Sequence, residues 1–123
     1  MAKLFFDTNY FINLHSKRAP IPITLEELEN HDLFVSVLTY HIFTYSYKIK
    51  IPNKELSDSL DTFYLVDLNE KILVKALIGP TSDLEDNIQL HSAAESECDI
   101  FLTQDRKLLD IKFFGKTRIT SSI

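Results

Sequence analysis

Four of the aspartates in this 123-residue sequence stand where their carboxylates could act together on one ligand. Asp7 directly follows the apolar run Leu4-Phe5-Phe6, and Asp105 follows a second apolar run. Asp83 and Asp86 are three residues apart, which places them one turn apart on nearly the same helix face. Carboxylates gathered in one small volume repel one another, so some must take up protons unless a cation lies among them. Hard oxygen donors without a histidine or cysteine set favour magnesium or manganese over zinc.

Each of these aspartates also has an explanation that involves no ligand. Aspartate is a preferred helix N-cap, and both Asp7 and Asp105 precede a predicted helical turn. Acidic side chains in the first turn of a helix, such as Asp83 and Asp86, complement the helix dipole. For each residue taken alone, the sequence leaves both interpretations open.

Apolar strands alternate with amphipathic helices along the chain and would position these residues. Strands are predicted at residues 4–6, 33–37, 64–68 and 100–103, with a fifth at 117–120. Capping-box pairs predict helix starts at Thr24 with Glu27 and at Ser82 with Glu85. Alternating strands and helices imply a parallel sheet that is covered on both faces, which is an α/β fold. Ligands of such sheets bind beyond the carboxyl ends of the strands, where Asp7 and Asp105 are expected to meet in an acidic cleft.

The composition predicts a single domain that covers residues 1–123, with 45% apolar residues to form its core. Cys98 is the sole cysteine, which excludes an internal disulfide. No apolar run near the N-terminus has the length of a signal peptide or membrane span, so we expect a cytoplasmic protein without a membrane partner. Residues 54–105 carry three basic and twelve acidic side chains, whereas residues 106–123 carry five basic and one acidic. This distribution suits a cation site beside a phosphate-binding edge.

Three motifs resemble those of the PIN-domain family. The opening motif after the first strand is Asp7-Thr8-Asn9. The second half contains Asp83-Leu84-Glu85-Asp86-Asn87 and then Thr103-Gln104-Asp105-Arg106-Lys107-Leu108-Leu109. It is similar to the branch of the family with a D-x-x-D-N helix followed by a T-G-D-x-x-L-L turn. The resemblance covers most of the chain and implies a three-layer α/β/α fold with a four- or five-stranded parallel sheet.

The resemblance also implies a function, which is magnesium- or manganese-dependent hydrolysis of RNA phosphodiester bonds. Many members are toxin ribonucleases paired with a small antitoxin, and many form homodimers. We expect the RNA substrate to be single-stranded. The positions that match the family's catalytic, metal-binding acids are Asp7, Asp83, Asp86 and Asp105, and those that match its supporting polar residues are Asn9 and Thr103. Arg106 and Lys107 could neutralise phosphates beside the site or be ordinary solvated charges.

One position departs from the family pattern. After the second strand the family usually has a serine, five further residues and then a glutamate, but here Ser36 leads to Ile42. A side chain at position 42 is therefore expected near the metal site rather than in the core. The missing carboxylate gives an alternative function, a catalytically degenerate PIN-like module that binds RNA or a protein partner. The aromatic stripe of Tyr40, Phe43 and Tyr47 is predicted to be core or dimer interface, in preference to a base-stacking surface.

Overall fold

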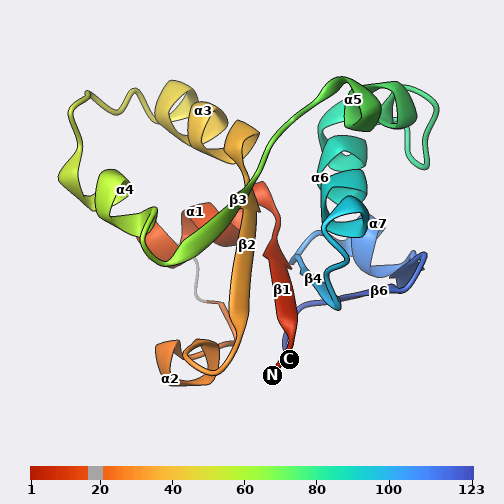
Figure 1. Ribbon diagram of the computed structural model, residues 1–123, viewed down its shortest axis with the longest axis horizontal. Coiled ribbons are helices and arrows are strands. Elements are labelled where there is room, and N and C mark those ends of the chain that lie inside the picture. The colour runs from red at the N-terminus through yellow and green to blue at the C-terminus, as the bar shows by residue number, and fades with distance from the viewer. Residues whose placement is uncertain (17–20) are drawn as a thin grey trace.

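Over residues 1–16 and 21–123, which the computed structural model describes, the chain forms a six-stranded sheet in the order β3-β2-β1-β4-β6-β5 (Figure 1). The strands are β1 (Lys3–Phe6), β2 (Asp32–Ser36), β3 (Phe63–Val66), β4 (Ile100–Leu102), β5 (Phe113–Phe114) and β6 (Thr117–Thr120). The pairs from β3 to β6 are all parallel, and β5 pairs with β6 in the antiparallel sense. The predicted parallel sheet is confirmed. Strand β5 is an addition, because a two-residue strand is too short to show a period in the sequence.

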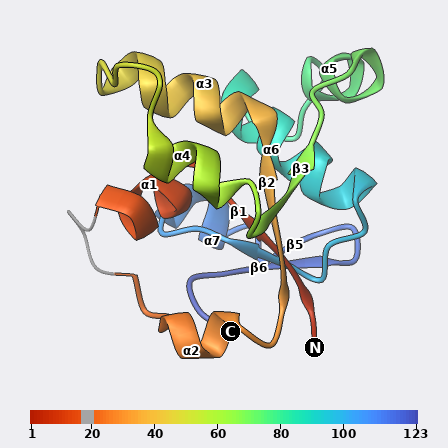
Figure 2. The same cartoon turned by 60° about the vertical axis from the view of Figure 1, so that its left-hand side comes forward.

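Helices cover both faces of the sheet. Helices α1 (Thr8–Ser16), α3 (Val37–Ser46) and α4 (Lys54–Ser59) lie on one side, and α5 (Glu70–Ala76), α6 (Leu84–Glu95) and α7 (Arg106–Leu109) lie on the other (Figures 1 and 2). The short helix α2 (Leu25–Leu28) begins at the predicted capping box of Thr24 and Glu27, which the structure forms. The three-layer α/β/α architecture is therefore confirmed. None of the described helices is long and apolar enough to cross a bilayer.

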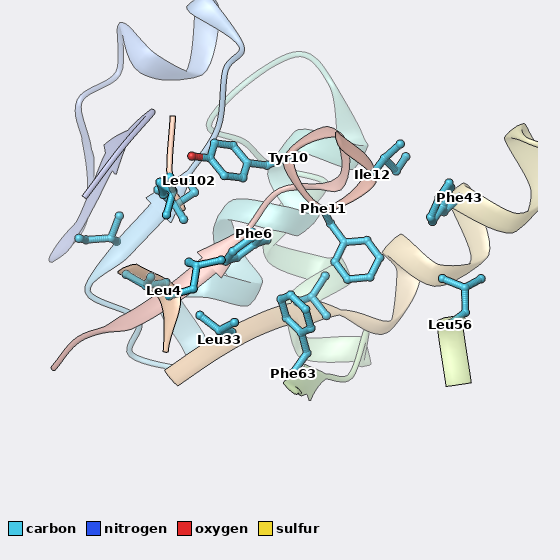
Figure 3. Close-up of a cluster of buried hydrophobic side chains, with 14 residues drawn as sticks. Leu4, Phe6, Tyr10, Phe11, Ile12, Leu33, Phe43, Leu56, Phe63 and Leu102 are labelled. Atoms are coloured by element: carbon cyan, nitrogen blue, oxygen red, sulfur yellow. The ribbon is translucent and has the colours of Figure 1, made fainter. Parts of the chain in front are cut away.

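Alternate residues of β1 pack against opposite helical layers. Leu4 and Phe6 belong to the core on the side of α1 and α3, where the Phe6 and Phe63 rings meet edge to face with centroids 5.2 Å apart (Figure 3). Phe5 belongs to the core on the side of α6, and its ring stacks on that of Phe101 at 5.5 Å. Because both faces of β1 are buried, the residue that follows this strand is held in a fixed position.

Helix α6 begins at a different cap from the predicted pair of Ser82 and Glu85. Asp83 is the N-cap, with extended backbone (φ −108°, ψ 116°), and its carboxylate accepts the N–H of Asp86 at 3.0 Å. The prediction was wrong because the two pairs have the same spacing and serine and aspartate are equally good caps, so spacing alone does not choose between them. As a consequence, the Asp83 carboxylate is fixed at the start of α6.

Candidate functional site

Asp7 and Thr103 lie side by side beyond the ends of two neighbouring strands. The register of β1 and β4 pairs Phe6 with Leu102, and the N–H of Asp7 donates to the Leu102 carbonyl at 3.1 Å. Side chains alternate along a strand, so Asp7 lies on the same side as Phe5, toward α6. Thr103 follows β4 in the same way, and its hydroxyl hydrogen-bonds the Asp7 carboxylate. The strand register therefore determines which polar residue contacts this acid.

Asp7 is a buried acid with only 7% of its surface exposed. Its Oδ1 accepts the N–H of Tyr10 at 2.7 Å, so it caps the first turn of α1. Burial raises the pKa of Asp7 to about 6, an effect opposed by the hydrogen bonds from Thr103 and Tyr10 and reinforced by the negative charges of Asp86 and Asp105. An ionised carboxylate in this place is costly unless positive charge comes near it.

The N-terminal turn of α6 brings a second perturbed acid to the same region. Asp86 is half-buried, and burial raises its pKa to about 6. The negative charges of Asp83, Asp105 and Glu85 raise this pKa further, whereas the positive charge of Lys107 lowers it. Since Asp105 acts on the pKa of both Asp7 and Asp86, the acids of α6 and of the two strand ends share one electrostatic environment. We call Asp7, Asp83, Asp86 and Asp105 the acidic cluster.

Three members of the acidic cluster are also helix caps. Asp105 is the N-cap of α7, where its Oδ1 accepts the N–H of Lys107 at 2.9 Å, and Asp7 and Asp83 cap α1 and α6 through the same oxygen. The hydroxyl of Thr103 accepts the N–H of Asp105 at 3.0 Å, so one threonine holds two of the acids. The capping interpretation is thus correct for Asp7 and Asp105, whereas Asp83, expected inside the first turn of its helix, is the N-cap of α6 instead. Capping is compatible with ligand binding, because it uses Oδ1 alone and directs three positive helix ends toward the cluster.

The remaining predicted polar residues lie around this cluster. Lys107 is close enough to Asp86 to lower its pKa, and Arg106 beside it is exposed. Asn9 is exposed in the first turn of α1. One turn further along, Asn13 donates to Gln104 at 3.3 Å and so links α1 to the loop before Asp105.

The segment after β2 contains Ile42, which was expected near the metal site, and the aromatic stripe. Ile42 is half-buried, and neither of the two core clusters found among the described residues includes it. Phe43 is buried in the core, and Tyr40 packs against that core while its hydroxyl lies 2.7 Å from that of Ser59. Tyr47 is 37% exposed. The core interpretation of the stripe is therefore correct for Tyr40 and Phe43.

A buried polar network next to the acidic cluster was not predicted. The hydroxyls of Thr8 and Thr39 are 3.1 Å apart, and Gln89 Nε2 donates to Thr39 Oγ1 at 3.5 Å. These contacts join α1, α3 and α6. In the sequence, Thr8 directly follows Asp7, and Gln89 lies one helical turn after Asp86. The signal in the sequence was a glutamine among the apolar residues of α6.

The chemistry of the acidic cluster fits a hard divalent cation. All its donors are carboxylate oxygens, and a cation among them would favour the charged forms of Asp7 and Asp86, which burial and neighbouring acids now disfavour. Among the described residues, no group of three or more acidic, histidine or cysteine side chains is already arranged to hold an ion. Asp83 and Asp105 are exposed, and each caps its helix through Oδ1, which leaves Oδ2 as the oxygen for an ion.

The contact between Thr103 and Asp7 gives a first testable prediction. Thr103→Val keeps the shape of this buried side chain but removes the hydroxyl that lowers the pKa of Asp7. We expect the pKa of Asp7 to move further upward and the unfolding free energy at neutral pH to fall by about 1–2 kcal/mol. Carboxyl carbon resonances followed through a pH titration would measure the pKa. An unchanged value would mean that the hydroxyl does not stabilise the charged form.

Comparisons with known proteins identify solved structures that have a similar fold. No protein-family model matches the chain, and no curated protein matches its sequence. A solved toxin–antitoxin complex from Klebsiella pneumoniae contains a similar chain, with a TM-score of 0.64 and 18% identity over 93% of this chain and 94% of that chain. VapBC2 from Rickettsia felis, solved bound to a DNA fragment from its promoter, gives a TM-score of 0.66 and 11% identity over 98% of each chain. The chain thus has the PIN-like α/β/α fold that its motifs resemble, shared along almost its whole length with chains of such complexes.

Proposed function

We propose that this protein is a magnesium- or manganese-dependent endoribonuclease that hydrolyses single-stranded RNA, and that it is the toxin of a toxin–antitoxin pair. The observation that carries the proposal is the acidic cluster, which lies at the carboxyl edge of the parallel sheet and contains two acids whose pKa values are raised to about 6. The likeness of the whole fold to chains of toxin–antitoxin complexes supports the biological role.

In this proposal the four aspartates hold the cation in two different ways. Asp7 and Asp105, from the ends of neighbouring strands, bind it directly, while Asp83 and Asp86 hold it partly through water or hold a second ion. Magnesium retains several of its waters in protein sites, so four direct carboxylate bonds are not required. A bound ion of this kind supplies Lewis acidity toward a phosphate oxygen and lowers the pKa of a bound water. The helix caps and the Thr103 hydroxyl keep the acids oriented for this role.

The basic residues beside the cluster are proposed to contact the RNA backbone. Lys107 lies near Asp86, and the adjacent Arg106 is exposed on the same first turn of α7. Asn9, in the first turn of α1, is proposed to orient the substrate together with Thr103. Because only a few cations make these contacts, RNA affinity should depend on salt with a modest slope.

A protein partner is part of the same proposal. Apolar side chains along and after α5 remain exposed in the isolated chain, among them Leu77 at 66% and Ile78 at 86%. Exposed apolar groups that lie together are typical of surfaces that bind another protein. We propose that antitoxin binding and homodimer formation use surfaces of this kind.

Metal titration together with an RNA cleavage assay tests the proposal. Calorimetry should show binding of Mn²⁺ that the double variant Asp7→Asn, Asp105→Asn loses, and cleavage of single-stranded RNA should stop with a chelator, resume with excess Mg²⁺ and decline as salt is raised. Metal binding that survives the double variant would contradict the site. Cleavage that is indifferent to chelator would contradict the mechanism, and RNA binding without cleavage would favour the degenerate module suggested by Ile42.

A further inference from the structure

Gln89 has a side-chain oxygen that the described part of the chain leaves without a hydrogen bond. The residue is 2% exposed, and its Oε1 is fully buried with no partner there. Its Nε2 donates to Thr39 at 3.5 Å, which is at the long limit for a hydrogen bond. Buried polar atoms are nearly always paired, and an unpaired one carries a desolvation penalty. The amide oxygen is therefore suited to a partner that the chain itself does not provide.

Two separate connections place this amide beside the acidic cluster. Gln89 is three residues after Asp86 in α6, hence on nearly the same face, and helical side chains incline toward the helix N-terminus, where Asp86 lies. Thr39, which accepts from Gln89, is 3.1 Å from the hydroxyl of Thr8, the residue next to Asp7. The amide is thus held between α6 and α3 on the side of Asp7 and Asp86.

No donor among the described residues is placed to reach this oxygen. Asp7 and Asp86 are acceptors alone when ionised, and the acids that act on them, Asp83, Asp105 and Glu85, add further negative charge. Lys107, the cation that lowers the pKa of Asp86, lies on the first turn of α7, whereas Gln89 lies one turn after Asp86 in α6. A divalent cation with its bound waters would supply both the positive charge that the acids lack and the donor that the amide lacks.

Helix α3 explains why such an oxygen matters in this chain. Ile42 lies one turn after Thr39, so an apolar side chain occupies the helix face next to the residue that holds Gln89. We propose that Gln89 Oε1 is a further oxygen of the cation site, contacting the divalent ion or one of its waters, and that it replaces the oxygen that position 42 does not provide. This inference rests on the proposed function, since it requires that the acidic cluster binds a divalent cation.

The chain offers a matched control for the test. Ser92, three residues after Gln89 in α6, is also fully buried, and its Oγ likewise has no partner among the described residues. It is one turn further from Asp86 than Gln89 is. Ser92→Ala should leave Mn²⁺ affinity unchanged and should leave the melting temperature of the metal-free protein unchanged or higher, because it removes an unpaired buried hydroxyl.

Calorimetric titration with Mn²⁺, combined with melting curves with and without Mn²⁺, measures the contribution of Gln89. Gln89→Leu should weaken Mn²⁺ binding about 10-fold, in the range found when residues around metal ligands are replaced. The metal-free protein should melt at the same temperature or higher, and the increase caused by Mn²⁺ should be smaller. Gln89→Glu should do the opposite, with tighter Mn²⁺ binding and a lower melting temperature without metal.

The possible outcomes separate this inference from the function on which it rests. A Gln89→Leu protein that binds Mn²⁺ as wild type does, and loses the same stability with and without the ion, would show that the amide only links α6 to Thr39, and would overturn the inference alone. Wild-type protein that binds no Mn²⁺ would overturn both. Weaker binding in Gln89→Leu with unchanged binding in Ser92→Ala would support the inference.

Discussion

Asp7→Asn is expected to stabilise the metal-free protein by about 3 kcal/mol at about pH 8 and, at the same time, to abolish RNA cleavage. The gain arises because burial raises the pKa of Asp7 from 3.8 to about 6, so that folding at high pH buries an unfavourable charge. Asparagine removes this charge but keeps an oxygen that can accept the N–H of Tyr10 and cap α1. Cleavage is lost because the amide is a poor ligand for the proposed cation.

The pH dependence has a definite sign. Below about pH 4 Asp7 is protonated in both the folded and the unfolded protein, so its penalty is absent. Between about pH 4 and the folded-state pKa of about 6, the folded protein keeps a proton that the unfolded chain has lost, and stability falls as pH rises. Above that range the loss is constant. The partly exposed Asp86, with its pKa also raised to about 6, should add a smaller loss in the same window.

Urea denaturation across this pH range, with and without Mg²⁺, measures the effect. The gain from Asp7→Asn should vanish toward about pH 4, and Mg²⁺ should stabilise wild type more than the variant. Asp61→Asn, a change at an exposed aspartate after α4, is the control and should alter stability by less than about 0.5 kcal/mol. A variant less stable than wild type at about pH 8 would mean that the fold already satisfies the Asp7 charge.

Ile42→Glu supplies the carboxylate that the family pattern has at this position, and it should increase the affinity of the site for a divalent cation. Ile42 is half-buried, lies on α3 one turn after Thr39, and belongs to neither described core cluster, so a carboxylate there can face the acidic cluster. Two unit charges about 4 Å apart interact by roughly 4 kcal/mol at intermediate dielectric. After partial screening, we expect divalent affinity to rise about 10- to 100-fold and any RNA cleavage to increase.

The added carboxylate should also destabilise the metal-free protein through repulsion, by about 1–2 kcal/mol, and Mg²⁺ should offset that loss. Ile42→Gln, which has similar size and no charge, separates repulsion from altered packing. Melting curves of both variants with and without Mg²⁺ make the comparison. If Ile42→Glu melts low and Mg²⁺ fails to raise its melting temperature, the side chain at position 42 does not face the acidic cluster and the glutamate is an unpaired charge.

Those features of the fold and site that depend on short segments could be predicted from the sequence. Apolar runs that end at Asp7 and near Asp105 identified two parallel strands, and the shared carboxyl edge of such strands brought the two acids together. The spacing of Asp83 and Asp86 placed both at one helix end, as the structure has them.

Other features depend on tertiary contacts that leave no local pattern. Asp7 is 7% exposed whereas Asp105 is exposed, although both follow a buried strand and both cap a helix. Asp7 also comes close enough to Asp86 of α6 for their charges to interact, a proximity between residues far apart in the sequence. The link between Thr39 and Gln89 joins residues 50 positions apart, and neither residue type signals the other.

Three of the aspartates both cap helices and belong to the proposed cation site, which affects the mutations that a genetic selection would recover. At codons 7, 83 and 105, the changes that inactivate the proposed site with the smallest loss of stability are those to residues that still cap a helix, chiefly asparagine and serine. Codon 86 encodes an acid inside the first turn of α6 instead of its cap, so a wider range of residues is compatible with a folded chain there. A selection for inactive but abundant protein should therefore return a narrow spectrum of alleles at the three capping codons and a broad one at codon 86.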